Sequence, residues 1–391
     1  MSAAAKNNNP TEENGPSPIA PKKYWAIVRT QFFRNHMGVA GFLVFIALVL
    51  VALFAPILAN DVPLVAKYKG ETYYPALPTY LDTFPVPTPI VDWLRQEVKV
   101  DGDNIFSSHY PVLEGKTWKE AIAQDFQDSR DDWFVRPPVF FSFREINEFK
   151  ALPGSIDQWG EGAQHQSKHW LGTDGQGRDV LARMIHGTII SLSVGVVAVS
   201  IYTAIGVVLG LLAGYFGGWV DLVLSRITEV VICFPSFFLI ITVVALLPRS
   251  IYNIMIVIGL TSWPGVFRLM RGEALRVKEL EYCISSRALG ASPWRVMFKH
   301  IFPNALAPVF VTATFGVAGA ILIENALSFL GFGVSPPTAS WGEIVNQGRI
   351  YVKEGLYHLV VAPGVAIFVT VTALNLVGQA LRDAMDPKLR Q

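Results

Sequence analysis

Six long apolar runs constrain the fold of this 391-residue chain more than any other feature. A helix of about 20 apolar residues is long enough to cross a bilayer. The runs lack the alternating pattern that the strands of a membrane barrel require. We therefore predict an all-α polytopic membrane protein with six transmembrane helices. The expected spans are 38–59, 188–215, 230–247, 251–267, 305–323 and 358–381.

The charge distribution predicts which parts of the chain lie on each side of the membrane. Residues 1–37 hold five Lys and Arg against two acids, and segment 268–303 holds seven against three. Segment 60–187 instead holds thirteen basic and nineteen acidic residues. Because short basic loops stay in the cytoplasm, both termini (including the tail 382–391) and segment 268–303 are expected inside. Segment 60–187 is then expected outside, which agrees with six spans.

The region before the first span is predicted to be a tail and a surface helix. Residues 1–22 have the polar, Pro- and Asn-rich composition of a disordered tail. Residues 23–37 are predicted to form an amphipathic helix on the membrane surface. The run at 38–59 shows no small-residue cleavage site and is expected to be a retained anchor.

Segment 60–168 is predicted to fold as a compact α+β insertion outside the membrane. Its large aromatic residues can supply a small core: they include Trp93, Trp118, Trp133 and Trp159. The sequence VFFSFREI at 139–146 is typical of a strand. No cysteine lies in the insertion, so no disulfide is expected there. The insertion could be a docking surface for an external partner or an elaboration that only caps the external face.

Several residues in the apolar runs have a predicted structural role. Gly206, Gly210 and Gly214 repeat at the four-residue spacing that lets membrane helices pack closely. Glu229 and Glu324 lie towards the ends of their spans. Capping or interfacial solvation is favoured for both carboxylates over the alternative, a proton relay.

Segment 268–303 is a polar, basic excursion between two apolar spans, and it is predicted to form a helix, a turn and a helix. A first helix over 272–289 is expected to end at Gly290, in the left-handed conformation that glycine adopts most easily. Ser292 is a suitable N-cap, and a proline follows at the first helical position. The second helix is expected over 293–301, with Pro303 ending it. A projecting short helix of this kind suits a groove on a partner protein.

EYCISSRALGASPWRVMFKHIFPN resembles the EAA loop of bacterial ABC importer permeases. Glu281, Gly290, Ile301 and Pro303 stand at the positions of that motif. The resemblance implies that a short coupling helix sits in a cleft of a cytoplasmic ATPase and transmits its closure to the spans. The residues expected to form this ATPase-coupling site are Glu281, Ser285, Ser286, Ala288, Leu289, Gly290, Ala291, Ser292 and Pro303. Cys283, Ser285 and Ser286 depart from the family, which there has a small hydrophobic residue and two alanines.

HWLGTDGQGRDVLARMIHGTIISLSVG at 169–195 resembles the C-type permease subunit of dipeptide and oligopeptide importers. Further similar stretches lie at 215–235, 326–345 and 381–390. The stretch LANDVPLVAKYKGETYYPAL and the long insertion are similar to the subgroup that serves larger peptides and microcin C.

The glycines of segment 169–187 could suggest a phosphate-binding loop, but no Walker lysine follows them. The segment is expected to lie as an amphipathic helix on the outer face, where a role as gate or interface is favoured over ligand binding. The residues expected there are Gly172, Thr173, Asp174, Gly177, Arg178 and Asp179.

The chain holds no GxxxxGKS or GxxxxGKT, no HExxH and no nucleophile-elbow motif, so no catalytic site of its own is expected. The resemblance implies an inner-membrane permease subunit of an ATP-driven peptide importer, with the path lined by the second to sixth spans. Expected partners are a second homologous permease, two ATPases that hold the ATP and Mg, an external solute-binding protein and the lipid bilayer. No cofactor, metal or nucleic acid is expected on this chain. Open alternatives are nickel, glutathione or sugar oligomers as cargo, a secondary transporter or channel, and a membrane-anchored receptor or assembly factor.

Overall fold

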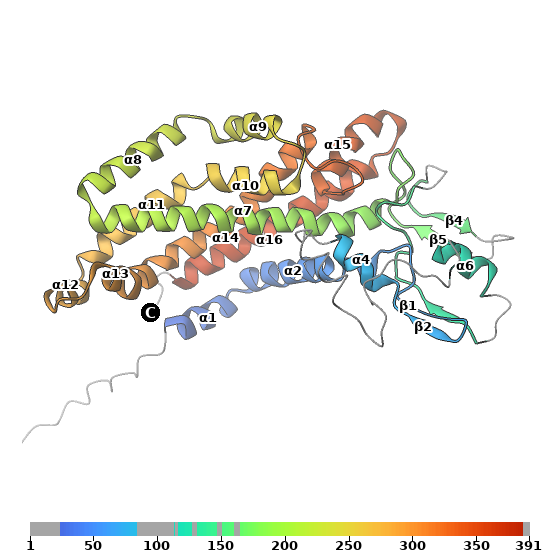
Figure 1. Ribbon diagram of the computed structural model, residues 1–391, viewed down its shortest axis with the longest axis horizontal. Helices are drawn as coiled ribbons and strands as arrows, with labels where there is room; N and C mark the ends of the chain where they lie inside the picture. The colour runs from blue at the N-terminus through green and yellow to red at the C-terminus, as the bar shows by residue number, and fades with distance from the viewer. Residues whose placement is uncertain are drawn as a thin grey trace, which may run out of the picture.

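The computed structural model describes residues 24–83, 113, 116–126, 131–146, 151–159 and 165–385. Long helices form one elongated body, and the strands gather with short helices at one end of it (Figure 1). The opposite end carries α12, the start of α1 and the end of α16 (Figure 1). The predicted tail 1–22, Trp93 and the side chain of Trp159 lie outside the described part of the chain.

Ten α-helices make up most of the helical body among the described residues. They are α1 (Tyr24–Arg34), α2 (His36–Leu53), α7 (Val180–Phe216), α8 (Gly218–Ile232), α9 (Ser236–Leu246), α10 (Ile251–Thr261), α11 (Pro264–Lys278), α12 (Glu281–Ala288), α14 (Phe302–Phe329) and α16 (His358–Met385). Shorter elements connect them: α3 (Ala55–Leu58), α13 (Pro293–Val296), the π-helical turn η3 (Met297–Ile301), α15 (Trp341–Tyr351) and the 3-10 turn η4 (Val352–Glu354).

Four single helical runs among the described residues are long and apolar enough to cross a membrane: α2, α7, the continuous run 293–329 and α16. Two bent pairs, α8–α9 and α10–α11, raise the number to six if each pair is one span. Six spans were predicted, but two of them are not straight helices. The predicted span 230–247 contains a 79° bend, and α8 begins before it, at Gly218. The predicted span 251–267 contains a 41° bend, and α11 continues beyond it to Lys278.

Proline causes both breaks. Pro235 is extended, with ψ of 119°, and precedes α9, while Pro264 occupies the first turn of α11. A proline ring clashes with the preceding turn and offers no N–H, so the helix before it ends.

Helix α7 is the central element of the body and packs closely against α11. A Cβ atom on Gly206 would lie 2.6 Å from the Cβ of Val266, and one on Gly210 would lie 2.7 Å from the Phe267 carbonyl oxygen. On Gly214 it would lie 2.6 Å from the Cβ of Ala274. The predicted close-packing role of the three glycines is confirmed.

The insertion between α3 and α7 is α+β in its described part. Strands β1 (Val65–Tyr68), β2 (Glu71–Tyr73) and β3 (Trp133–Val135) form an antiparallel sheet in the order β2-β1-β3, and β4 (Ser155–Trp159) pairs with β5 (His165–His169). Two helices accompany them, α4 (Ala76–Thr83) and α6 (Trp118–Gln124).

The core of the insertion uses fewer of the aromatic residues than expected. Trp118 is buried beside Tyr68, whereas Trp133 is 48% exposed, so its predicted core role is wrong. The predicted strand at 139–146 is also wrong, because the segment makes only an isolated bridge between Val139 and Ala59. Val139, Phe140 and Phe141 pack inwards as an irregular extended chain.

Candidate functional site

Segment 268–303 forms a projecting turn whose chemistry matches the local prediction. Gly290 has φ of +80°, and it closes α12 through hydrogen bonds from its own N–H to the Arg287 carbonyl (2.9 Å) and from the Ala291 N–H to the Ser286 carbonyl (3.1 Å). This pair of bonds is a Schellman motif. The Ser292 hydroxyl then accepts a bond from the Arg295 N–H at 3.4 Å. The left-handed glycine and the serine cap are confirmed.

Two details of this segment differ from the prediction. The helix expected over 272–289 breaks at Glu279 and Leu280, because Leu280 is extended and starts the separate helix α12. Pro303 does not end the second helix, which runs on through a π-helical turn into α14. Proline sits in the first turn of α14, where its missing N–H costs little, and the wider π turn before it accommodates the ring.

The tip of the turn is open to solvent and partly apolar. Leu289 is 89% exposed, and Tyr282 and Trp294 are also exposed, whereas Cys283 beneath them is fully buried. Glu281, Ser285, Ala288 and Ser292 are exposed, and Ser286 and Ala291 are half-buried. Pro303 is exposed at the start of α14. The predicted coupling residues therefore share one end of the molecule, mostly on its surface.

Hydrogen bonds join α12 to its neighbours. The Arg287 guanidinium donates to the Lys278 carbonyl at 2.9 Å, and the Ser286 hydroxyl lies 3.4 Å from His300 Nε2 in η3. The Lys278 ammonium donates to the Gly214 carbonyl at 3.0 Å, near the end of α7. A displacement of α12 can therefore reach α11, α14 and α7.

Segment 172–179 lies at the opposite end of the helical body, near the strands, and it is a tight loop. The predicted amphipathic helix over 169–187 is wrong: β5 ends at His169, and α7 begins at Val180 and continues into the span. Gly172 and Gly177 have φ of +72° and +84°, so each turn requires a residue without a Cβ. Asp174 accepts hydrogen bonds from the N–H groups of Gln176 (2.8 Å) and Arg178 (3.0 Å).

The polar side chains of this loop are buried and paired. Asp179 caps α7 by accepting from the Ala182 N–H at 2.7 Å, and its second oxygen lies 2.7 Å from His169 Nδ1. The Thr173 hydroxyl accepts from the Ala151 N–H at 2.6 Å. Asp179 and Thr173 are satisfied within the chain, and in the described loop Arg178 Nη2 is buried without a hydrogen bond; this pattern favours a structural role over direct ligand binding.

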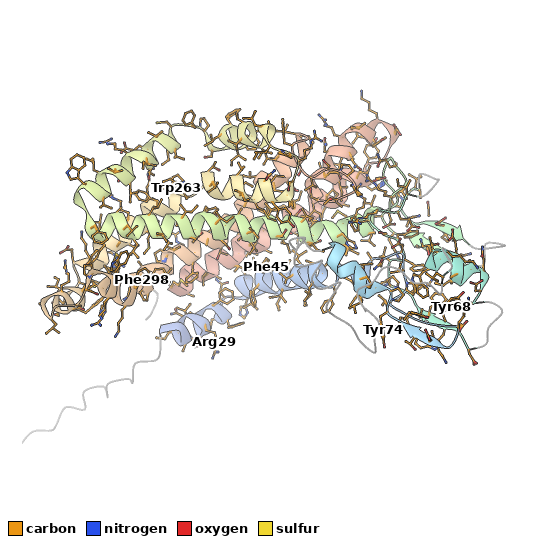
Figure 2. The ribbon with its side chains drawn as sticks, viewed as in Figure 1. Arg29, Phe45, Tyr68, Tyr74, Trp263 and Phe298 are labelled. Carbon is orange, nitrogen blue, oxygen red and sulfur yellow. The ribbon has the colours of Figure 1, made fainter. Side chains whose placement is uncertain are left out.

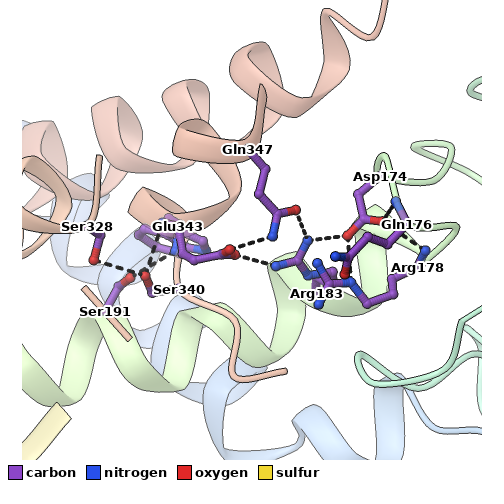
Figure 3. Close-up of polar contacts among 10 residues, drawn as sticks. Asp174, Gln176, Arg178, Arg183, Ser191, Ser328, Ser340, Glu343 and Gln347 are labelled. Atoms are coloured by element: carbon purple, nitrogen blue, oxygen red, sulfur yellow. Dashed lines mark hydrogen bonds and ion pairs between the residues drawn. The ribbon is translucent and has the colours of Figure 1, made fainter. Parts of the chain in front are cut away.

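Arg183 is the centre of an ion network that the sequence did not reveal. It is fully buried and its guanidinium donates to Asp174, to Glu343 on α15 and to Gln347 on α15, the last at 2.7 Å (Figure 3). Arg178 also donates to Asp174, at 2.8 Å. The two cations and two carboxylates balance, which is how buried charges are tolerated. The network ties the start of α7 to α15.

A weak signal for this network was present in the sequence. Arg183 and Glu343 interrupt apolar surroundings, and both lie inside stretches that resemble the permease family. Only the fold shows that these two residues, 160 positions apart, are partners.

The two glutamates of the spans behave differently from each other. Glu229 is exposed and pairs with Arg226 at 2.5 Å, on the surface of α8. Glu324 is fully buried, so the expected interfacial solvation is wrong there; it accepts a hydrogen bond from the Ser328 hydroxyl at 2.8 Å. Packing of the 331–340 loop and α15 over this end of α14 removes the carboxylate from solvent.

Comparison with known proteins identifies the family. Residues 206–391 match the model of the binding-protein-dependent transport system inner membrane component, and residues 23–76 match the N-terminal transmembrane domain of oligopeptide transport permease C.

Individual relatives agree with these two matches. The chain is 41% identical to the glutathione transport system permease protein GsiD of Pectobacterium atrosepticum, over 57% of this chain and 74% of that protein. It is 31% identical to the peptidoglycan transport system permease protein YejE of Agrobacterium fabrum, over 95% of this chain and 96% of that protein. It is 40% identical to the dipeptide transport system permease protein DppC of Alkalihalophilus pseudofirmus, over 64% of this chain and 78% of that protein. The chain therefore belongs to the family of inner-membrane permease components of binding-protein-dependent ABC transporters, and it is a multi-pass membrane protein.

Proposed function

We propose that this chain is one permease subunit of an ATP-driven importer of peptides, and that ATPase closure drives it through the turn at Gly290. The observation that carries the proposal is the projecting α12 turn, with an exposed apolar tip and hydrogen bonds to two flanking helices. An apolar residue as exposed as Leu289 suits a groove on a partner. In this proposal the groove belongs to an ATPase subunit.

The transmission of movement follows from the bonds of α12. The Arg287 bond to α11 and the Ser286 contact with η3 hold the turn at both of its ends. Because α11 packs on α7 through close glycine contacts, a push on the turn would move several spans as one unit. Interdigitated helices switch between discrete arrangements rather than deform continuously. Such a switch would open the path alternately to the two faces.

The cargo is proposed to be peptides, because the matching relatives are described as carrying dipeptides, glutathione and peptidoglycan. Glutathione is itself a peptide and fits as an alternative cargo. The relative from the peptidoglycan system covers 95% of this chain, so the match extends through most of the insertion. Docking of the solute-binding protein and simple capping both remain open as roles for this insertion.

The proposed orientation follows from the charge distribution. The basic segments 1–37 and 268–303 would lie in the cytoplasm and the acidic segment 60–187 outside. The α12 turn and the strands lie at opposite ends of the body, which supports this orientation (Figure 1). The assembly would contain a second homologous permease, two ATPases that hold ATP and Mg, and an external solute-binding protein.

The coupling proposal is tested by changing Gly290 in the complete importer. Gly290→Pro cannot adopt φ of +80°, because proline is fixed near −65°. We expect the complex to lose peptide-stimulated ATP hydrolysis and uptake in proteoliposomes. Gly355→Pro is the matched control, since Gly355 has φ of +84° and no atoms near its Cβ position, but follows α15 at the other end. Intact assembly and intact coupled hydrolysis in Gly290→Pro would refute the coupling role.

The cargo is tested separately, by measuring uptake of labelled alanine dipeptide, alanine tripeptide, glutathione and a muropeptide by the unmodified importer. Uptake of at least one of these supports the proposal. Uptake of none of them, with ATP hydrolysis intact, would refute peptide import.

A further inference from the structure

A groove of about 350 Å³ opens on the helical body where the α10–α11 break meets α7 and α14. Its lining includes Tyr202, Ser262 and Thr312, with glycines at 265, 316 and 319. Gly316 and Tyr202 lie near the middle of two long spans. Trp263, which adjoins the groove at the break, lies well inside the helical body and away from both of its ends (Figure 2). The groove is therefore at membrane depth.

Hydroxyl groups converge on this groove from three parts of the chain. Within the described residues, the hydroxyls of Tyr202 and Ser262 make no hydrogen bond, so both can still donate and accept. Thr312 uses its proton on the Pro308 carbonyl at 2.9 Å and keeps its acceptor capacity. Non-helical backbone at membrane depth, as at the break beside Ser262, occurs only where protein or a water-filled cavity covers it. A purely lipid-facing groove would not need these groups.

Two of the groove glycines, Gly265 and Gly319, differ from those that pack α7 against α11, whereas Gly316 lies directly against the Tyr202 hydroxyl. A Cβ on Gly265 or Gly319 would meet no heavy atom within 4 Å, whereas one on Gly210 would collide with α11. An interior helical glycine costs roughly 0.5–1 kcal/mol relative to alanine. The open space beside Gly265 and Gly319 leaves their backbone accessible to a molecule outside this chain.

None of the described residues that line the groove is charged. A fixed charge at membrane depth would hold peptides of opposite charge and reject those of like charge, because the local dielectric is low. The lining is neutral and mostly apolar, with residues such as Ile258 and Phe315, and its three hydroxyls offer hydrogen bonds to the N–H and C=O groups that every peptide carries. The volume lies within the roughly 300–1,000 Å³ of small-molecule sites.

We infer that this groove is one wall of the translocation path and that it binds the backbone of an extended peptide in transit, irrespective of its side chains. This inference rests on the proposed function, and it assigns the path to particular residues. The partner permease would supply the facing wall, since the groove is open on one side in this chain.

The test uses single cysteines in the complete importer, in a Cys233→Ser background because Cys233 is exposed and Cys283 is buried. Gly319→Cys and Gly265→Cys are compared with Gly364→Cys, a control glycine on α16 that also has open space at its Cβ position. We expect a membrane-impermeant, cationic methanethiosulfonate to modify the two groove cysteines at least about ten-fold faster than the control, since only a water-accessible thiol ionises and reacts. Modification should lower alanine-tripeptide uptake about ten-fold. Excess tripeptide should in turn slow the modification of the groove cysteines.

Two results would overturn the inference. Reaction only with membrane-permeant N-ethylmaleimide, at the control rate, would place the groove against lipid. Protection in the complex with reaction in the isolated chain would assign it to packing against a partner helix. The proposed function still holds after either result, provided that the Cys233→Ser parent importer takes up peptide. A parent that takes up no peptide refutes that function instead, and the comparison of reaction rates still decides whether the groove is open to water.

Discussion

Replacing Arg183 with methionine should destabilise the protein by about 3–5 kcal/mol, the usual cost of removing one partner from a buried ion pair. Arg183 is fully buried and holds Asp174 and Glu343 together. Methionine keeps much of the side-chain volume, so the loss would come from Glu343 left without its cation, while Asp174 keeps Arg178. A loss of this size is a large part of the 5–15 kcal/mol that typically separates folded from unfolded protein.

The measurement is unfolding of the purified chain by SDS in mixed micelles, followed by tryptophan fluorescence. Arg226→Met is the matched control, because Arg226 pairs with Glu229 on the surface, with side chains 69% and 51% exposed. Such an exposed pair contributes only about 0–1 kcal/mol. Removing one charge of each sign, in Arg183→Met/Glu343→Gln, should recover about 2 kcal/mol or more of the loss, since the remaining Arg178–Asp174 pair is then balanced.

The reasoning about the network would be refuted by either of two results. One is an Arg183→Met variant as stable as Arg226→Met, which would mean that water or movement of α15 relieves the charges. The other is an Arg183→Met/Glu343→Gln variant no more stable than Arg183→Met, which would attribute the loss to packing instead of charge.

Three further changes test other parts of the structure, the first two by the same unfolding assay and the third by proteolysis. Gly210→Ala should cost about 1–3 kcal/mol by overpacking against α11, whereas Gly364→Ala, which meets no atoms, should be neutral or slightly stabilising. Asp179→Ala should cost about 0.5–2 kcal/mol through loss of the α7 cap, and Asp179→Asn should recover part of it; no loss in the alanine variant would refute the cap. The Tyr68 hydroxyl, 2.6 Å from Asp125, is the main cause that lowers the pKa of that carboxyl; burial opposes it, and the Lys116 contacts add to the lowering. The bond therefore stabilises the insertion at pH above the unfolded pKa of about 3.9, and this contribution is lost as pH falls through the folded pKa. In the Tyr68→Phe variant, a protease should cut the insertion faster than in the wild type near neutral pH and at the wild-type rate in acid. Equal rates for the variant and the wild type at both pH values would contradict the assignment.

The local structure of the α12 turn could be predicted because neighbouring residues determine it. A glycine after a helical run and a Ser-Pro pair two residues later satisfy the free groups of two helix ends without help from the rest of the fold. The same reasoning was wrong about Pro303, because proline is tolerated in a first turn and a π turn absorbs the strain. It also missed the break at Leu280, which no proline or glycine marks.

Apolar length, read from the sequence alone, determined that the chain is a multi-pass membrane protein, with four to six candidate spans among the described residues, because crossing a bilayer requires long uncharged helices whatever their packing. The sequence also determined the turn at Gly290 and the close-packing glycines of α7. Only the tertiary structure decided which charges are paired, since Arg183 and Glu343 meet across 160 residues of chain. It alone placed Ser262 beside Tyr202 and Gly319 in one groove. Such contacts depend on how whole helices pack, and no local pattern of residues encodes that arrangement.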